Sequence, residues 1–208
     1  MKQYISKRIR TLFNVLLITL LMLVCGACLK TDQKTEVTVL QAWGQSSFNV
    51  TSDKVGTSAS GKIVIYKKTQ GLLGIRIISD ISISETDFGG VAFYLPGGTV
   101  VDEIMSTYPE GEESQKNDEA IQIWTNDSDQ EGYHSMIEID RNHDYETAGG
   151  GKGFVVIDAT YKYDNSQQDA PDQLAFAVDC GASRKKGYVV WGIAHREIIV
   201  DLKTELNR

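Results

Sequence analysis

The sequence contains none of the short motifs that identify serine hydrolases, zinc proteases or P-loop proteins. No G-x-S-x-G pentapeptide is present to form a nucleophile elbow. H-E-x-x-H is missing, and no two of the three histidines are spaced i, i+4 to share a helical face. The glycine-rich stretch 149–153 contains a Gly-Lys pair, but Glu146 and Gly153 stand where a phosphate-binding loop needs Gly and Ser or Thr. These absences favour a function other than catalysis.

Cysteine is scarce, with three in 208 residues, and two of them end an apolar N-terminal leader. Small residues, Gly26 and Ala27, directly precede Cys28, and an apolar run covers 15–24. This order of parts resembles the bacterial lipoprotein signal, whose cysteine is lipidated and becomes the first residue after cleavage. The resemblance covers about the first 28 residues, and it departs from the family at Cys25, where an aliphatic residue is usual. The leader also has a basic head, formed by Lys2, Lys7, Arg8 and Arg10.

The resemblance implies a signal peptide over 1–27, acylation of Cys28 by chains such as palmitate, and a tether over 28–36. The body then lies outside the cytoplasm, anchored to the lipid bilayer of the cell membrane or outer membrane. An uncleaved anchor helix over 12–29 is the alternative, and it leads to the same location. With Cys25 removed and Cys28 acylated, Cys180 is the one thiol left, so no intramolecular disulfide forms and stability depends on burial.

The charge of the chain restricts its partners. The formal net charge of −7 becomes −11 once the four basic residues of the leader are removed. An acidic body disfavours nucleic acid and anionic lipid, and it is compatible with cations, neutral glycans or basic protein surfaces.

Residues 37–208 are predicted to form one all-β domain. Ile75, Ile77, Ile81 and Ile83 alternate with polar residues, and 174–180 alternates strictly, which places Cys180 on an apolar, buried face. The segment 51–61 fits a loop, and 99–108 fits a strand with or without a final helical turn. About ten to twelve short strands without a long amphipathic helix indicate a two-sheet antiparallel β-sandwich of immunoglobulin-like or cohesin-like architecture.

Two polar groups are candidate sites. Asp140, Asn142 and Asp144 have the D-x-N-x-D spacing of the first half of an EF-hand loop and could bind calcium, although the later Gly and Glu of that loop are absent. The alternative is that these side chains satisfy the backbone of a turn. Asp127 and Asp129 form a second acidic turn beside Trp124.

Tryptophan gives the remaining indication of function. Trp124 is out of phase with Ile121 and Ile123, so it is predicted to lie on the outer face of its strand as a ligand-binding residue, together with Asp127 and Asp129. Burial against a loop or against the tether is the alternative. The other two tryptophans, Trp43 and Trp191, lie in apolar stretches and are predicted to be core residues.

These observations favour a non-catalytic, membrane-anchored module that binds an envelope protein or a glycan. The alternative is an extracytoplasmic hydrolase or metal-assisted enzyme that uses carboxylates such as Asp140, Asp144 and Asp158. A purely structural envelope component is the third hypothesis. An exposed surface around Trp124 would indicate a glycan, a bare apolar patch would indicate a protein, and a pocket of carboxylates would indicate catalysis.

Overall fold

The computed structural model describes residues 42–69, 71–110, 120–125, 133–147, 150–163 and 171–202. The predicted signal peptide and tether, with Cys28, lie outside the described residues, as do Asp127 and Asp129. The described residues belong to one compact unit, Leu40–Arg208, which has its own hydrophobic core and is therefore expected to fold alone. No helix in the described ranges is long and apolar enough to cross a membrane.

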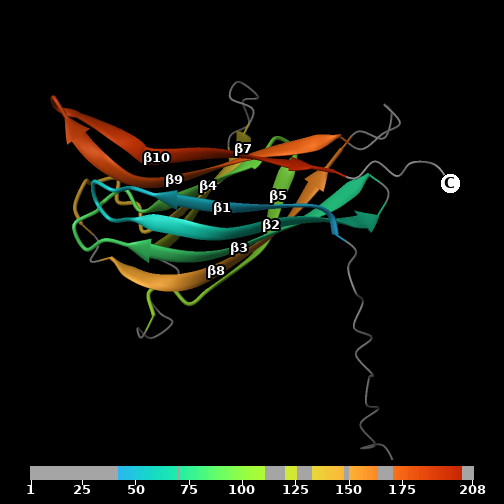
Figure 1. Ribbon diagram of the computed structural model, residues 1–208, viewed down its shortest axis with the longest axis horizontal. Helices are drawn as coiled ribbons and strands as arrows, with labels where there is room; N and C mark the ends of the chain where they lie inside the picture. The colour runs from blue at the N-terminus through green and yellow to red at the C-terminus, as the bar shows by residue number, and fades with distance from the viewer. Residues whose placement is uncertain are drawn as a thin grey trace, which may run out of the picture. The chain divides into compact units, whose positions relative to one another are not determined.

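The described residues form ten strands, which make two five-stranded antiparallel sheets that face each other (Figure 1). The first sheet, in spatial order, consists of β1 (Ala42–Thr51), β2 (Ser58–Thr69), β3 (Leu72–Ile83), β8 (Gly151–Lys162) and β5 (Thr99–Ser106). The second sheet consists of β10 (Tyr188–Asp201), β9 (Gln173–Lys185), β4 (Val91–Pro96), β7 (Tyr133–Ile139) and β6 (Ile121–Thr125). The predicted β-sandwich is therefore confirmed.

The core forms because the strands alternate apolar and polar residues, so each sheet has one apolar face to bury. Ile75, Ile77, Ile81 and Ile83 of β3 are buried, and Cys180 is completely buried on the inner face of β9. Phe48 of the first sheet meets Phe93 of the second edge to face, with ring centroids 6.2 Å apart. Burial raises the pKa of the Cys180 thiol to about 12, and the neighbouring Asp179 adds to this rise. The prediction of a buried cysteine is thus confirmed.

Two local predictions need correction. The loop expected over 51–61 is shorter, because β2 already begins at Ser58 and pairs with both β1 and β3. Gly61 is required inside this strand, since a Cβ there would clash with the carbonyl oxygen of Ile78. Strand pairing has thus overridden the loop-like composition. In the second case, β5 ends at Ser106 and no helical turn follows it in the described residues.

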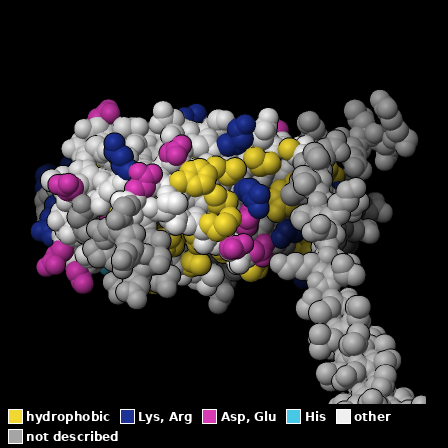
Figure 2. Space-filling view, turned by 90° about the horizontal axis from the view of Figure 1, so that it is seen from below, with side chains coloured by type: hydrophobic (Ala, Val, Ile, Leu, Met, Phe, Trp, Pro, Cys, Tyr) yellow, Lys and Arg dark blue, Asp and Glu magenta, His cyan; other side chains and the backbone are white. Residues whose placement is uncertain are grey.

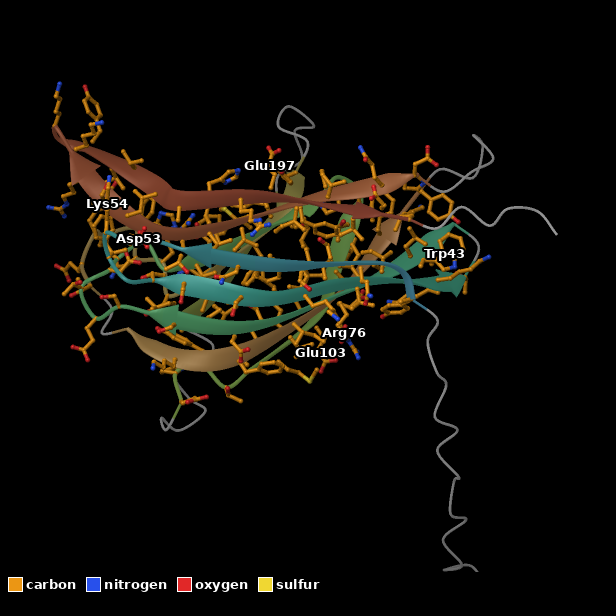
Figure 3. The ribbon with its side chains drawn as sticks, viewed as in Figure 1. Trp43, Asp53, Lys54, Arg76, Glu103 and Glu197 are labelled. Carbon is orange, nitrogen blue, oxygen red and sulfur yellow. The ribbon has the colours of Figure 1, made fainter. Side chains whose placement is uncertain are left out.

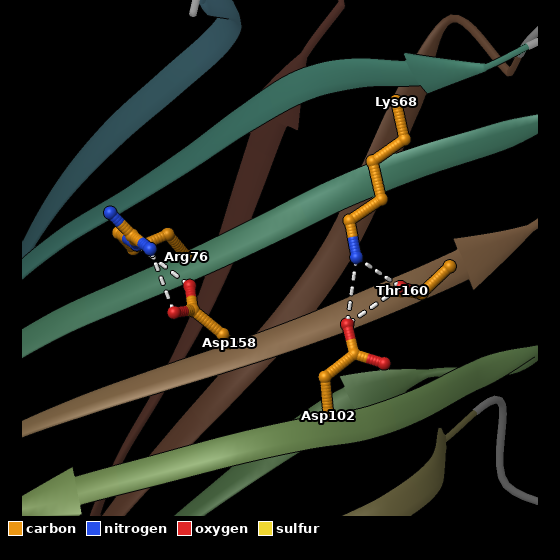
Figure 4. Close-up of polar contacts among 5 residues, drawn as sticks. All are labelled: Lys68, Arg76, Asp102, Asp158 and Thr160. Carbon is orange, nitrogen blue, oxygen red and sulfur yellow. Dashed lines mark hydrogen bonds and ion pairs between the residues drawn. The ribbon is translucent and has the colours of Figure 1, made fainter. Parts of the chain in front are cut away.

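The outer face of the first sheet carries ion pairs between strands (Figure 4). Arg76 of β3 donates two hydrogen bonds to the carboxylate of Asp158 on β8, at 2.7 and 2.8 Å. Lys68 donates to Asp102 at 2.8 Å and to Thr160 at 2.6 Å. Asp158 is therefore engaged on the first sheet, whereas Asp140 follows β7 of the second sheet.

Candidate functional site

A buried carboxylate, Glu138, organises the outer face of the second sheet. Its neighbours Ile137 and Ile139 point into the core, so Glu138 faces outward, yet only 1% of it is exposed. Oε2 accepts a hydrogen bond from Trp124 Nε1 at 2.6 Å and lies 2.9 Å from His143 Nε2. The carboxylate thus fixes the positions of an indole and an imidazole that belong to different segments of the chain.

Arg141 provides the counter-charge. Its Nη1 donates to Oε1 of Glu138 at 2.9 Å and its Nε donates to the carbonyl oxygen of Gly89 at 2.9 Å. The residue is 7% exposed, and its buried Nη2 has no hydrogen-bond partner among the residues that the structure describes. The ion pair therefore lies away from water, where each charge depends on the other.

Two loops support this ion pair. Asp87 holds the loop before β4, because its carboxylate accepts hydrogen bonds from the backbone N–H groups of Gly89 at 2.8 Å and Ala182 at 3.1 Å. The carbonyl oxygen of Phe88 in turn accepts from the N–H of Asn142 at 2.9 Å, which joins this loop to the segment after β7. The site is thus built from rigid strands and mutually bonded loops.

Five aromatic rings continue from this point across the surface, and we call them the aromatic strip. Trp124 and His143 have ring centroids 5.7 Å apart, and His143 and Trp191 are 5.2 Å apart. Trp191 then contacts Tyr145 at 6.0 Å and Phe88 at 5.8 Å. The guanidinium of Arg141 lies over the Trp191 ring at 5.1 Å. The strip is therefore continuous and is supported by a cation from within.

The outer members of the strip face solvent. Trp124 is 48% exposed and Tyr145 is 45% exposed. Tyr145 also adopts a left-handed backbone conformation, with φ at 66°, which is unfavourable for a bulky side chain. Strained residues of this kind occur most often at binding sites and switch regions. Exposure and strain together mark the strip as a candidate binding surface.

A pocket of about 420 Å³ opens beside Trp124. Its walls combine one large aromatic ring with several hydrogen-bonding groups, and they are formed by Gln122, Trp124 and residues 140–144. An aromatic platform beside convergent polar groups is suited to a ligand that has both an apolar face and hydroxyl groups.

The three predicted calcium ligands line this pocket, but two of them already have protein partners. Oδ2 of Asp140 accepts a hydrogen bond from the Tyr108 hydroxyl at 2.5 Å. The side-chain oxygen of Asn142 accepts from the backbone N–H of Asp144 at 2.7 Å, which is the bond of an Asx turn. The described residues contain no group of three or more His, Cys, Asp or Glu side chains that could hold a metal ion. Calcium binding therefore stays a prediction.

Replacing Asp140 by Asn is expected to raise the melting temperature at pH 7 by about 1–3 °C. Burial raises the pKa of Asp140, and the nearby Asp87 raises it further, so ionisation at neutral pH opposes folding. Asn can still accept from Tyr108 and tolerates the left-handed φ of 53° at this position. The gain should shrink as the pH falls through the raised pKa of Asp140 towards the usual carboxyl pKa, because the folded wild type then keeps its proton, and below the usual pKa it should stay constant, because the unfolded wild type is protonated as well. Thermal unfolding from pH 3 to pH 8 measures this.

The same variant tests calcium. If Asp140 is a ligand, excess calcium raises the melting temperature of the wild type but not that of Asp140→Asn or Asp140→Ala. Equal melting curves of the wild type with calcium and with chelator would contradict the calcium hypothesis. Asp201, an exposed carboxylate at the end of β10, provides the control position, since Asp201→Asn should change neither result.

The structure brings together only some of the sequence candidates. Trp124, Asp140, Asn142 and Asp144 share one pocket. The prediction that Trp191 is a core residue is wrong, because it lies in the aromatic strip, whereas Trp43 packs partly against the core as expected. Glu138, Arg141 and His143 were not predicted from the sequence. The one available signal was a Glu and a His within five residues of each other, which is common in solvent-exposed turns.

A second buried carboxylate lies on the same outer face. In the strand register Ala92 of β4 lies between Glu138 on β7 and Asp179 on β9. Asp179 accepts a hydrogen bond from the Tyr94 hydroxyl at 2.9 Å and lies 2.6 Å from His195 Nδ1. Burial, followed by the charge of Asp179, raises the pKa of Tyr94 to about 12. Tyr94 therefore stays a neutral donor at physiological pH, and this network stiffens the sheet beneath the site.

Comparison with known proteins does not assign the chain to a family. No protein-family model matches the sequence. A comparison with curated proteins found no similar sequence. One solved structure, described as "pH-induced modulation of Streptococcus parasanguinis adhesion by Fap1 fimbriae", covers 79% of this chain and 92% of its own at 8% identity, with a TM-score of 0.35. A similarity this low carries no inference about function.

Proposed function

We propose that this protein is a lipid-anchored, extracytoplasmic module that binds a glycan without catalysing a reaction. Acylated Cys28 and the tether 28–36 would hold the domain at the cell membrane or outer membrane. The observation that carries the glycan assignment is the half-exposed Trp124, held in place by Glu138 at the edge of a polar pocket.

The chemistry of the strip fits a sugar. One face of a pyranose ring carries C–H groups that stack on an indole, while its hydroxyl groups need donors and acceptors at the rim. Trp124 offers the indole, and Gln122, Asn142 and Asp144 line the adjoining pocket with amide and carboxylate groups. Because Glu138 fixes the indole through Nε1, the ring loses little freedom when a ligand stacks on it.

Replacing Trp124 by Ala is expected to weaken glycan binding about tenfold or more, because the substitution removes an aromatic anchor. Residues 30–208, which include the whole compact unit, would be screened on an array of bacterial surface glycans, and the dissociation constant of each hit measured by calorimetry. Met105→Ala is the matched control, since Met105 is similarly exposed, at 47%, on the other sheet. Binding that survives in Trp124→Ala, or an array without hits, would contradict the proposal.

An envelope protein is the second candidate ligand, and an apolar patch favours it. Three exposed apolar side chains lie on the edge strand β5 and on β8, namely Val100 at 63%, Met105 at 47% and Phe154 at 37%. Figure 2 shows hydrophobic side chains collected on the face that is seen from below. Charged residues in the same strand, Asp102 and Glu103, and a bulge between Val101 and Glu103 make it a poor template for strand addition. The glycan assignment is therefore the stronger one.

The carboxylate-based hydrolase remains the alternative with a direct test. Asp140 and Asp144 line one pocket, but Asp158 lies on the other sheet and is bound by Arg76. Asp140 is also engaged by Tyr108. Product release from a bound glycan that stops in Asp144→Asn would establish the enzyme and overturn the non-catalytic proposal.

A further inference from the structure

The hairpin between β9 and β10 projects from the sandwich and carries a group of cations. β9 ends at Lys185 and β10 begins at Tyr188, so the turn contains two residues, Lys186 and Gly187. Both have positive φ, at 49° and 84°, as in a type I′ turn. The exposed side chains of the tip are those of Arg184, Lys185, Lys186 and Tyr188, the last of which is 77% exposed. Figure 1 shows the hairpin extending beyond the neighbouring strands at the upper left.

Lys186 is an unusual residue for its backbone conformation. The first position of a type I′ turn favours Asn, Asp or Gly, because these residues tolerate the left-handed region. Lysine is strained there, with φ at 49°, and its exposed side chain adds nothing to the core. Strain that the fold does not require indicates a functional reason for the side chain. The side chain at this position places a positive charge at the extreme tip.

The cationic tip is continuous with the aromatic strip. Arg184 lies over the ring of Tyr145 at 5.7 Å and over that of Phe88 at 5.8 Å, and its Nη2 donates to the carbonyl oxygen of Tyr145 at 3.2 Å. The base of the hairpin is thereby joined to the loops that carry the strip. A ligand that runs along the rings from Trp124 towards Tyr145 therefore reaches Arg184 and then the turn at Lys186.

We infer that the ligand is an anionic glycan polymer whose sugar rings lie on the aromatic strip and whose carboxylate or phosphate groups contact Arg184 and Lys186, while Lys185 adds to the positive charge of the tip. This inference rests on the proposed glycan-binding function and extends it. The net charge of the whole chain is negative, but three consecutive cations give this one hairpin a local positive charge. Their charge attracts a polyanion to the tip, and the rigid two-residue turn holds the charges in place.

The position of the tip favours a polymer as its ligand, rather than the membrane to which the protein is anchored. The chain enters the described domain at Ala42, and Figure 3 shows the nearby Trp43 at the end of the sandwich opposite to Lys54 and the hairpin. An anchor at Cys28 joins the domain at the Trp43 end. The basic tip is therefore at the far end of the domain from the anchored end.

The test uses Lys186→Asn, which removes the charge and also relieves the turn. Asn-Gly is the preferred pair for a type I′ turn, so we expect the melting temperature to rise while binding weakens. Three probes are compared on residues 30–208: a carboxylated polysaccharide, a phosphorylated polysaccharide and neutral dextran. The affinity for the two anionic probes should fall about two- to fivefold in Lys186→Asn. In the double variant Lys185→Gln, Lys186→Asn, the affinity for the anionic probes should fall by a factor equal to the product of the factors measured for the two single variants. The loss should disappear at 1 M salt, where screening is short-ranged.

The possible results either overturn the inference or identify the group that binds the tip. Unchanged affinity of the double variant for both anionic probes overturns this inference, while a loss in Trp124→Ala alone leaves the glycan proposal standing. Equal binding of dextran and the anionic probes also overturns it. Binding to vesicles that contain anionic lipid, but not to either polymer, would assign the tip to a membrane surface instead. If carboxylate and phosphate polymers differ, the stronger one identifies the anionic group.

Discussion

Replacing Glu138 by Ala is expected to lower the free energy of unfolding by about 3–5 kcal/mol, the cost of leaving a buried charge unpaired. Arg141 would keep its charge at 7% exposure without the carboxylate that neutralises it. Trp124 and His143 would lose their shared acceptor at the same time, so glycan binding should fall as well. Urea unfolding followed by tryptophan fluorescence measures the stability.

Two further variants separate charge from packing. The double replacement Glu138→Leu with Arg141→Met removes both charges and keeps apolar volume, so it should recover most of the stability that Glu138→Ala loses. It should not recover binding, because Leu cannot accept from the Trp124 indole. Glu197→Ala, at an exposed position on β10 labelled in Figure 3, should change stability by less than about 0.5 kcal/mol. A loss below about 1 kcal/mol in Glu138→Ala would contradict a buried ion pair.

Replacing Cys28 by Ala is expected to abolish acylation and to leave the precursor unprocessed in the host cell. The lipoprotein hypothesis assigns the acyl chains to this thiol, so an alkynyl palmitate label should be absent from the variant. The apparent mass should also stay that of the full 208 residues. Metabolic labelling, gel migration and fractionation of membranes measure the three effects.

Cys25→Ala is the matched control for this experiment. Cys25 stands three residues before Cys28 and is removed with the signal peptide if cleavage occurs after Ala27. The variant should therefore be processed and labelled as the wild type is. Label that disappears in Cys25→Ala and persists in Cys28→Ala would move the lipidation site. Mature protein without label in either variant would contradict lipidation.

The fold was accessible from the sequence because strand alternation is a local signal. The buried faces of β3 and β9 could be assigned from the two-residue alternation of apolar and polar side chains alone, and both assignments agree with the structure. The extent of β2 was not accessible in this way. Ser58 to Gly61 resemble a loop in composition, and they are strand residues because β1 and β3 supply hydrogen-bond partners from elsewhere in the chain.

Half of the site could not be predicted from the sequence, because it depends on contacts that the local alternation of residues does not show. Trp124 could be identified because its phase relative to Ile121 and Ile123 is local. The burial of Glu138 depends on a turn of the chain at Asp140, which has a left-handed backbone conformation, after which Arg141 donates a hydrogen bond back to the Glu138 carboxylate. Trp191 was misassigned because a bulge places two β10 residues opposite one β9 residue between Trp191 and Ala194, so the alternation of Ile198 and Val200 does not extend back to it.

Because the single cysteine of the domain is buried, the surface of the domain can be labelled selectively at introduced cysteines. In residues 30–208 the only thiol is that of Cys180, which is completely buried, and burial raises its pKa to about 12. Maleimide and iodoacetamide reagents act on exposed thiolates, so they should leave it unmodified in the folded state. A cysteine introduced at Tyr188 or Val100 would then be the sole labelling position. One fluorophore at the hairpin tip and, in another sample, one on β5 would report which end of the molecule a ligand approaches.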